Sequence, residues 1–253
     1  MQRPRILVFA SGEKTVELGG GSGFQELVEF SRTSPPVLDA DIVAVVSNYA
    51  RGGVSDKADK LGVDFVHWPG PFDALGYQHH VKMFQAGFVM CSGWIKLVQG
   101  LYPNTTVNIH PAPLPEFGGP GMWGHYVHEA VIQAFREGTI TQSAVSMHFV
   151  IDRGADKKAY DKGPIIFQFP VLIREEDTAK TLAERVNEKE RAWQACILNL
   201  VVHKRIWLEG EDERDWEVFH TCPELAKFIP GRYLPPGAEI HNTPKFSVRE
   251  IPH

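Results

Sequence analysis

Two polar residues that could act on one reacting atom stand near the middle of the chain. Asn108 and His110 flank Ile109 at the end of 106–110, a run of strand-forming residues that prolines then interrupt. Side chains two residues apart on a strand point to the same face, so the amide and the imidazole can converge on one atom. The amide N–H can stabilise an oxyanion, and the imidazole can move a proton or donate to the same oxygen. The pair therefore suits attack on a carbonyl carbon, although the spacing also fits a strand end whose polar groups only satisfy the backbone.

Three carboxylates lie in a later loop between two runs of strand-forming residues. They are Asp152, Asp156 and Asp161. Catalytic groups often collect in loops that a rigid sheet holds in place, but three solvated aspartates are also ordinary there. Spacing alone does not choose among them.

A glycine-rich stretch is a candidate phosphate site. Residues 19–23 read Gly-Gly-Gly-Ser-Gly and precede a helical pattern that begins at Phe24. Backbone N–H groups at a helix N-terminus attract phosphate through hydrogen bonds and the helix dipole, and the Ser22 hydroxyl adds a donor. The spacing matches neither the Walker A motif nor the dinucleotide-binding fingerprint, so a flexible turn is the alternative.

Alternating strand and helix patterns position these candidates. Strands are expected in five apolar runs, at 6–10, 41–47, 63–66, 88–91 and 106–110. Helical spacing predicts helices at 24–30 and at 55–61, the second ending at Gly62. This alternation predicts an α/β fold with an open, mostly parallel, twisted sheet of Rossmann type, flanking helices, and ligands at the carboxyl ends of the strands.

The pattern changes in the second half of the chain. The runs 144–150 and 164–171 predict a hairpin-like pair of strands. The periodicity of 178–203 predicts a long helix, with Asp177 as its N-cap.

Composition narrows the class of protein. The chain of 253 residues is 43% hydrophobic and 23% charged, with a formal net charge of −5, which favours a small-molecule partner over nucleic acid. Three cysteines without a CxxC pair argue against a disulfide framework and a metal site. The first apolar run is too short for a membrane span or a signal peptide, so a cytoplasmic protein is expected. We expect one domain over 1–205 and a C-terminal extension of unassigned role over 206–253.

Four segments together resemble a known enzyme family. They are, in order along the chain, Asn108–Pro115, His128–Val131, His148–Val150 and Asp161–Ile166. They are similar to the phosphoribosylglycinamide formyltransferases, and the resemblance covers residues 5–205. It implies the formyltransferase-like fold, no metal, and transfer of a formyl group from the co-substrate 10-formyltetrahydrofolate to the amine of glycinamide ribonucleotide in purine biosynthesis.

The resemblance also implies roles for individual residues. Asn108, His110 and Asp161 match the family's catalytic triad, and Asp161 is preferred because it directly precedes Lys-Gly-Pro. The positions implied to bind the acceptor's phosphate and ribose are Gly21, Ser22, Gly23 and Glu190. The positions implied to line the folate pocket are Trp94, Ile95, Lys96, Leu97 and Val98.

Two departures from the family keep other functions open. Glu13–Gly19 resembles an insertion before the phosphate loop, and Gly23 replaces an asparagine typical of the family. The rival enzymes are a formyltetrahydrofolate hydrolase, in which water replaces the amine, and an amino-sugar formyltransferase. A folate-binding regulatory relative without catalysis is the alternative from another class. The C-terminal extension is a candidate for subunit contacts in a homodimer.

Overall fold

A central sheet organises the chain, in a computed structural model that describes residues 2–12, 19–152, 154, 156–210 and 215–235. Within these residues the sheet has seven strands in the order β3-β2-β1-β4-β5-β6-β7. The strands are β1 (Arg5–Phe9), β2 (Asp41–Ser47), β3 (Asp64–His67), β4 (Phe88–Ser92), β5 (Thr106–His110), β6 (Gln142–Phe149) and β7 (Ile165–Leu172). β1 to β5 pair in parallel, and β6 and β7 add on antiparallel, which confirms the expected mostly parallel sheet. Of the expected insertion Glu13–Gly19, residues 13–18 lie outside the described residues.

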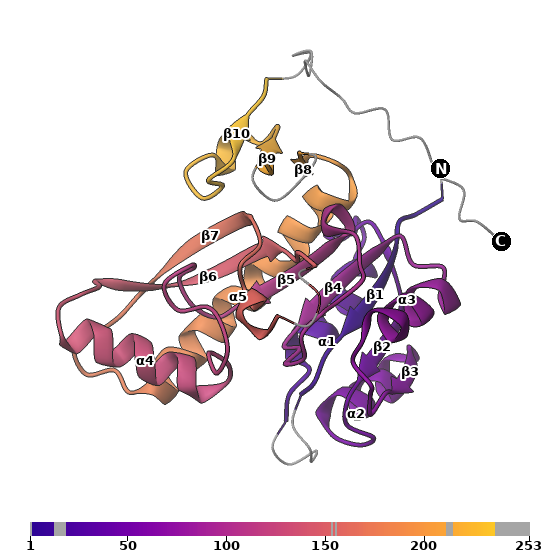
Figure 1. The fold of residues 1–253 in the computed structure, drawn as a ribbon, viewed down its shortest axis with the longest axis horizontal. Coiled ribbons are helices and arrows are strands. Elements are labelled where there is room, and N and C mark those ends of the chain that lie inside the picture. The colour runs from indigo at the N-terminus through magenta and orange to yellow at the C-terminus, as the bar shows by residue number, and fades with distance from the viewer. Residues whose placement is uncertain (1, 13–18, 153, 155, 211–214, 236–253) are drawn as a thin grey trace.

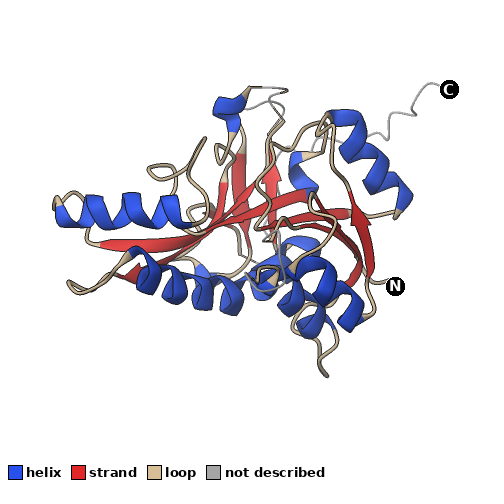
Figure 2. Cartoon of the chain, turned by 90° about the horizontal axis from the view of Figure 1, so that it is seen from below, coloured by secondary structure: helices blue, strands red, loops and turns tan. Residues whose placement is uncertain are grey.

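Helices cover both faces of this sheet (Figures 1 and 2). They are α1 (Ser22–Ser31), α2 (Gly53–Leu61), α3 (Ala74–Met83), α4 (His125–Arg136) and α5 (Ala179–Val202). Ile6 and Val8 of β1 belong to the core on one face, and Leu7 and Phe9 belong to the core on the other. Burial on both faces explains why this strand reads as a continuous apolar run.

The N-terminus of α5 differs from its predicted form. Thr178, not Asp177, caps the helix, because the Thr178 hydroxyl accepts the Thr181 N–H at 3.2 Å. Asp177 instead accepts the Arg174 N–H at 2.8 Å and forms a two-point ion pair with Arg185 at 2.6 and 2.9 Å. The Arg185 guanidinium is a stronger partner for a carboxylate than the backbone N–H groups of the first turn.

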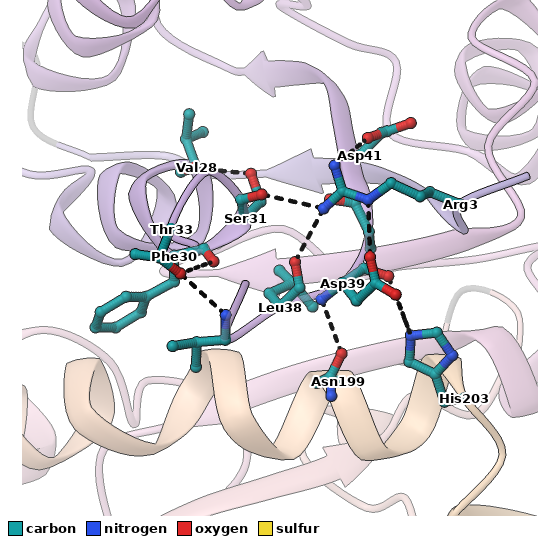
Figure 3. A network of polar contacts seen from close by, with 12 residues as sticks. Arg3, Val28, Phe30, Ser31, Thr33, Leu38, Asp39, Asp41, Asn199 and His203 are labelled. Atoms are coloured by element: carbon teal, nitrogen blue, oxygen red, sulfur yellow. Dashed lines mark hydrogen bonds and ion pairs between the residues drawn. The ribbon is translucent and has the colours of Figure 1, made fainter. Parts of the chain in front are cut away.

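A polar network fixes α5 at the edge of the sheet where β1 and β2 begin (Figure 3). The Arg3 guanidinium donates to the carbonyl oxygens of Ser31 and Ala40 at 3.0 Å each and pairs with Asp39 at 2.9 Å. Asn199 of α5 accepts the Asp39 N–H at 2.9 Å. The helix is therefore fixed at this end, and its earlier turns extend toward the opposite edge, where the strands end.

The chain after α5 forms a small second sheet. Within the described residues it has three strands, β8 (Ile206–Glu209), β9 (Glu217–His220) and β10 (Arg232–Tyr233). The carbonyl oxygen of Phe228 accepts the backbone N–H of Gln168 in β7 at 2.8 Å. The Phe228 ring packs against Phe169 and Trp193, with centroids 5.0 and 6.4 Å apart. This part of the extension therefore shares the core of the main sheet. The division at residue 205 into a domain and an extension stays a prediction.

Candidate functional site

Asp161 joins the two polar residues at the end of β5. Asn108 Nδ2 donates to Asp161 Oδ1 at 3.3 Å, and His110 Nδ1 lies 3.7 Å from Asp161 Oδ2. His110 is buried, with 4% of its surface exposed. The structure thus brings together the three side chains that sequence analysis singled out.

The loop before β7 holds Asp161 in an unusual backbone conformation. Its φ of +56° lies in the left-handed region, which an aspartate tolerates better than most residues. The Gly119 N–H donates to its Oδ2 at 3.1 Å. Gly163 is required nearby, because a Cβ there would overlap the carbonyl oxygen of Phe149. The carboxylate is therefore positioned by its own backbone and by a second loop.

The other two aspartates of this loop serve the backbone. Asp152 accepts the Gly100 N–H at 2.8 Å and the Gly154 N–H at 2.9 Å. Asp156 accepts the Lys158 N–H at 2.9 Å. Their hydrogen bonds are those of local turns and connections, whereas Asp161 contacts the polar side chains of the sheet.

A second histidine belongs to the cluster, and sequence analysis gave it no role. His148 of β6 lies opposite Asn108 in the antiparallel pair with β5. Its Nε2 is 3.0 Å from Asn108 Nδ2 and 3.4 Å from Asp161 Oδ1. Its Nδ1 lies 2.9 Å from the carbonyl oxygen of Phe149, so Nδ1 carries the proton that this contact needs. The sequence signal that could have identified His148 is its place in His148–Val150, one of the four segments that resemble the family.

The environment of His110 favours the neutral imidazole. Burial lowers its pKa, and the Asp161 carboxylate and the carbonyl of Phe117 oppose that shift. The Phe117 carbonyl oxygen lies 2.8 Å from Nε2, which fixes a proton on this nitrogen. Nδ1 then faces the carboxylate, where a second proton would find an acceptor. The ring can take up a proton here because both N–H groups of the imidazolium would have partners.

The Asp161 carboxylate is held in its charged form. Burial alone would raise its pKa, but the hydrogen bond from His148 and the charges of His110 and His148 lower it, to about 2 overall. The site therefore places a permanent negative charge beside a buried imidazole, which is the arrangement that stabilises an imidazolium formed during a proton transfer.

A cavity opens beside this cluster and reaches the predicted folate segment. It is small, with about 40 Å³ of space for the centres of water-sized molecules. Its walls include four of the five residues implied to line a folate pocket, Trp94, Lys96, Leu97 and Val98. The backbone N–H of Ile95, the fifth, donates to the Ser11 hydroxyl at 3.2 Å. Asn108, His148 and Asp161 of the cluster also line it.

The glycine-rich loop lies between the N-termini of two helices. Gly21 is the N-cap of α1, with a φ of +72° that only glycine adopts readily. A Cβ on Gly53, at the start of α2, would overlap the carbonyl oxygen of Gly19, so the loop packs directly on that helix. The first N–H groups of α1, from Ser22 onward, have no partner within the helix. This end therefore offers backbone donors, and the anion site that sequence analysis expects there stays a prediction.

Glu190 lies on α5, one turn before Gln194, which touches the glycine-rich loop. Gln194 Nε2 donates to the carbonyl oxygen of Gly23 at 2.9 Å. Residues four apart share a helix face, so Glu190 and Gln194 lie on the side of α5 that meets α1. Burial raises the pKa of Glu190 to about 7, and its hydrogen bond with Asn187 opposes the shift. A half-buried carboxyl group at this place can accept hydrogen bonds from a polar ligand.

The described residues contain neither a metal-binding cluster nor a membrane-spanning helix. No group of three or more His, Cys, Asp or Glu side chains among them could hold a metal ion. None of the helices in the described ranges has the length and apolarity to cross a membrane.

Comparisons with known proteins agree on one family. A family model described as Formyl transferase matches residues 5–198. The chain is 30% identical to the chloroplastic phosphoribosylglycinamide formyltransferase of Arabidopsis thaliana, over 82% of this chain and 69% of the relative. It is 27% identical to the phosphoribosylglycinamide formyltransferase of Bacillus subtilis, over 77% of this chain and 92% of the relative. Among solved structures, glycinamide ribonucleotide transformylase 1 of Symbiobacterium toebii superposes with a TM-score of 0.66 and 27% identity, covering 82% and 92% of the two chains.

Proposed function

Because the chain belongs to the formyl transferase family, we propose that it transfers a formyl group from 10-formyltetrahydrofolate to the amine of glycinamide ribonucleotide in purine biosynthesis. The protein is then a transferase with a folate co-substrate. The observation that carries the proposal is the convergence of Asn108, His110 and Asp161 at the end of a cavity.

The two substrates approach the cluster from two sides. The folate donor occupies the cavity lined by Trp94 and the following residues, with its formyl group toward Asn108. The acceptor places its phosphate on the N–H groups at the start of α1 and its ribose hydroxyls near Glu190. These places fit the chemistry of each group, because a helix N-terminus favours phosphate and a carboxyl oxygen accepts hydrogen bonds from hydroxyl groups.

The chemical step follows from the hydrogen bonds of the cluster. As the acceptor amine attacks, the formyl oxygen gains negative charge, and the Asn108 amide donates to it. His110 takes a proton that the amine releases, and the imidazolium is stabilised by the Asp161 carboxylate 3.7 Å away. The proton then passes to the folate nitrogen, directly or through a water that Asp161 positions, while the bond from that nitrogen to the formyl carbon breaks and the carbonyl re-forms on the acceptor amide.

A panel of acceptors tests the proposal. The purified protein is incubated with 10-formyltetrahydrofolate and, in separate reactions, with glycinamide ribonucleotide, amino sugars or no amine. Consumption of the donor is followed together with the formylated product. We expect rapid consumption only with glycinamide ribonucleotide; consumption without an amine would identify a hydrolase, and a preference for amino sugars would identify a sugar-amine transferase. Tight folate binding without consumption in any reaction would leave a regulatory folate-binding protein.

Two finer expectations belong to the same proposal. We place the enzyme in the cytoplasm, and we propose a homodimer in which the C-terminal extension contributes subunit contacts. Light scattering coupled to size-exclusion chromatography tests the second point, since a homodimer has twice the 28.3 kDa mass of the chain.

A further inference from the structure

Gly23, in the first turn of α1, has no room for a side chain. A Cβ there would overlap Ser92 Oγ and would lie 3.2 Å from both polar atoms of the Gln194 amide. The resemblance found in the sequence implies an asparagine at this position. The space that a larger residue would occupy is filled by two polar side chains from β4 and α5.

These two side chains and the carbonyl of Gly23 form a buried chain of hydrogen bonds, the relay. Ser92 Oγ donates to Gln194 Oε1 at 2.7 Å, and Gln194 Nε2 donates to the carbonyl oxygen of Gly23 at 2.9 Å. Ser92 is 7% exposed and Gln194 is 2% exposed. Neither amide atom of Gln194 is free to turn toward a ligand without leaving a buried polar group unsatisfied, so the relay has one stable arrangement.

The relay fixes the direction of a ligand-facing N–H group. The carbonyl of Gly23 and the N–H of Phe24 belong to one planar trans peptide and point in opposite directions. Holding the carbonyl against Gln194 therefore aims the Phe24 N–H toward the N-terminal end of α1. That end is where the glycine-rich loop leaves backbone donors for an anion.

The same helix face also carries Glu190. Glu190 and Gln194 are one turn apart on α5, so the relay sets the distance between the start of α1 and the Glu190 carboxyl group. An acceptor that binds with its phosphate at the start of α1 and its hydroxyl groups at Glu190 must match this distance, so its affinity depends on the relay.

We propose that Gln194, held by Ser92, is a positioning residue for the acceptor. It substitutes for the side chain absent at Gly23 by orienting the first turn of α1 from behind rather than by touching the phosphate. This inference rests on the proposed function, because it assumes that a phosphorylated acceptor binds at α1.

Steady-state kinetics of Gln194→Met provide the test. Methionine has nearly the volume of glutamine but neither donates to Gly23 nor accepts from Ser92. We expect the KM for glycinamide ribonucleotide to rise between about threefold and about tenfold, which corresponds to the loss of one or two buried hydrogen bonds. The KM for the folate donor and kcat should stay within about twofold, because the Gln194 side chain itself bonds to Ser92 and Gly23 and neither lines the cavity nor bonds to Asn108, His110 or Asp161. Gln133→Met is the matched control, since Gln133 is exposed on α4 and bonds only to Glu137 at 2.9 Å.

A second set of variants tests the space around Gly23. Gly23→Ala should raise the acceptor KM, because the new methyl group overlaps Ser92 Oγ. Ser92→Ala removes that oxygen. Adding Gly23→Ala to the Ser92→Ala variant should therefore raise the acceptor KM by a smaller factor than Gly23→Ala does in the wild type. Independent, additive effects of the two substitutions would contradict the packing that the relay requires.

Titration with inorganic phosphate separates this inference from the proposed function. Amide chemical shifts of Ser22 to Phe24 are followed in the wild type and in Gln194→Met. Weaker phosphate binding in the variant supports the relay even if no formyl transfer to glycinamide ribonucleotide occurs. An unchanged phosphate affinity together with an unchanged acceptor KM overturns the relay even if formyl transfer is rapid.

Discussion

Asn108 and His148 lie directly opposite each other in the antiparallel pair of β5 and β6, and their side chains meet at 3.0 Å. The contact uses the His148 nitrogen that faces the cavity, while the other nitrogen is fixed on the carbonyl oxygen of Phe149. Asn108 Nδ2 therefore lies between two partners, His148 Nε2 and Asp161 Oδ1, the second at 3.3 Å. A substrate oxygen that takes up an Asn108 N–H has to displace one of these two contacts.

Replacing His110 by alanine should lower turnover by about 10²–10⁴-fold, because the group that carries the proton between amine and product is lost. The KM for the folate donor should change little, since His110 does not line the cavity. Single-turnover rates with saturating donor measure the effect. Turnover within about threefold of wild type would remove His110 from the mechanism.

Replacing His148 by phenylalanine should lower kcat by at least about tenfold, because Asn108 and Asp161 each lose a hydrogen-bonding partner in a buried site. The substitution keeps the size of the ring and so preserves most of the packing. His79→Phe is the control, since His79 is exposed on α3. If both variants match the wild type in kcat, His148 has only a structural role.

Asp161 should contribute a part of the free energy of unfolding that is lost as the pH falls into the acid range. Its folded-state pKa, about 2, lies below the ordinary value of 3.8. A depressed carboxyl pKa stabilises the folded state above the ordinary pKa, and this contribution is lost as the pH falls through the folded value. Its size is about 2 kcal/mol. Urea unfolding at pH 4, 3 and 2 should therefore show a shallower loss of stability in Asp161→Asn than in the wild type. Parallel curves for the two proteins would contradict the depressed pKa.

Replacing Arg185 by methionine should destabilise the fold without changing catalysis. The hydrogen bonds from Arg185 hold the pKa of Asp177 well below its usual range, against the effect of burial. Loss of the guanidinium leaves a carboxylate whose side chain is only 2% exposed, at a cost of about 3 kcal/mol. Chemical denaturation measures this loss. Activity per folded molecule should stay at the wild-type level, because the pair lies at the start of α5, away from the cluster. Reduced activity with normal stability would assign another role to Arg185.

The residue pattern predicts most of the sheet. β2 and β5 begin and end where their apolar runs do, because a strand buried on both faces leaves a continuous hydrophobic segment in the chain. The convergence of Asn108 and His110 on one acceptor also follows from the two-residue period of β5.

Other features depend on contacts that local patterns do not contain. His148 reaches Asn108 only through the register of two strands joined by a long connection, and no spacing within β6 reveals that register. Asp161 was preferred to its neighbours on resemblance alone, because its placement depends on a left-handed backbone and on the Gly119 N–H from a distant loop. The N-cap of α5 was predicted wrongly at Asp177, since the competing Arg185 lies two turns further along the helix.

The packing of Phe228 on the main sheet limits how the chain can be shortened. Its ring, with those of Phe169 and Trp193, closes a layer of aromatic surface that β7 and α5 would otherwise present to water. Ile206, Leu208 and Val218 belong to the same hydrophobic core. A recombinant fragment that stops at residue 205 would carry an open apolar face and would tend to aggregate. Work on the minimal catalytic unit should therefore retain the small sheet.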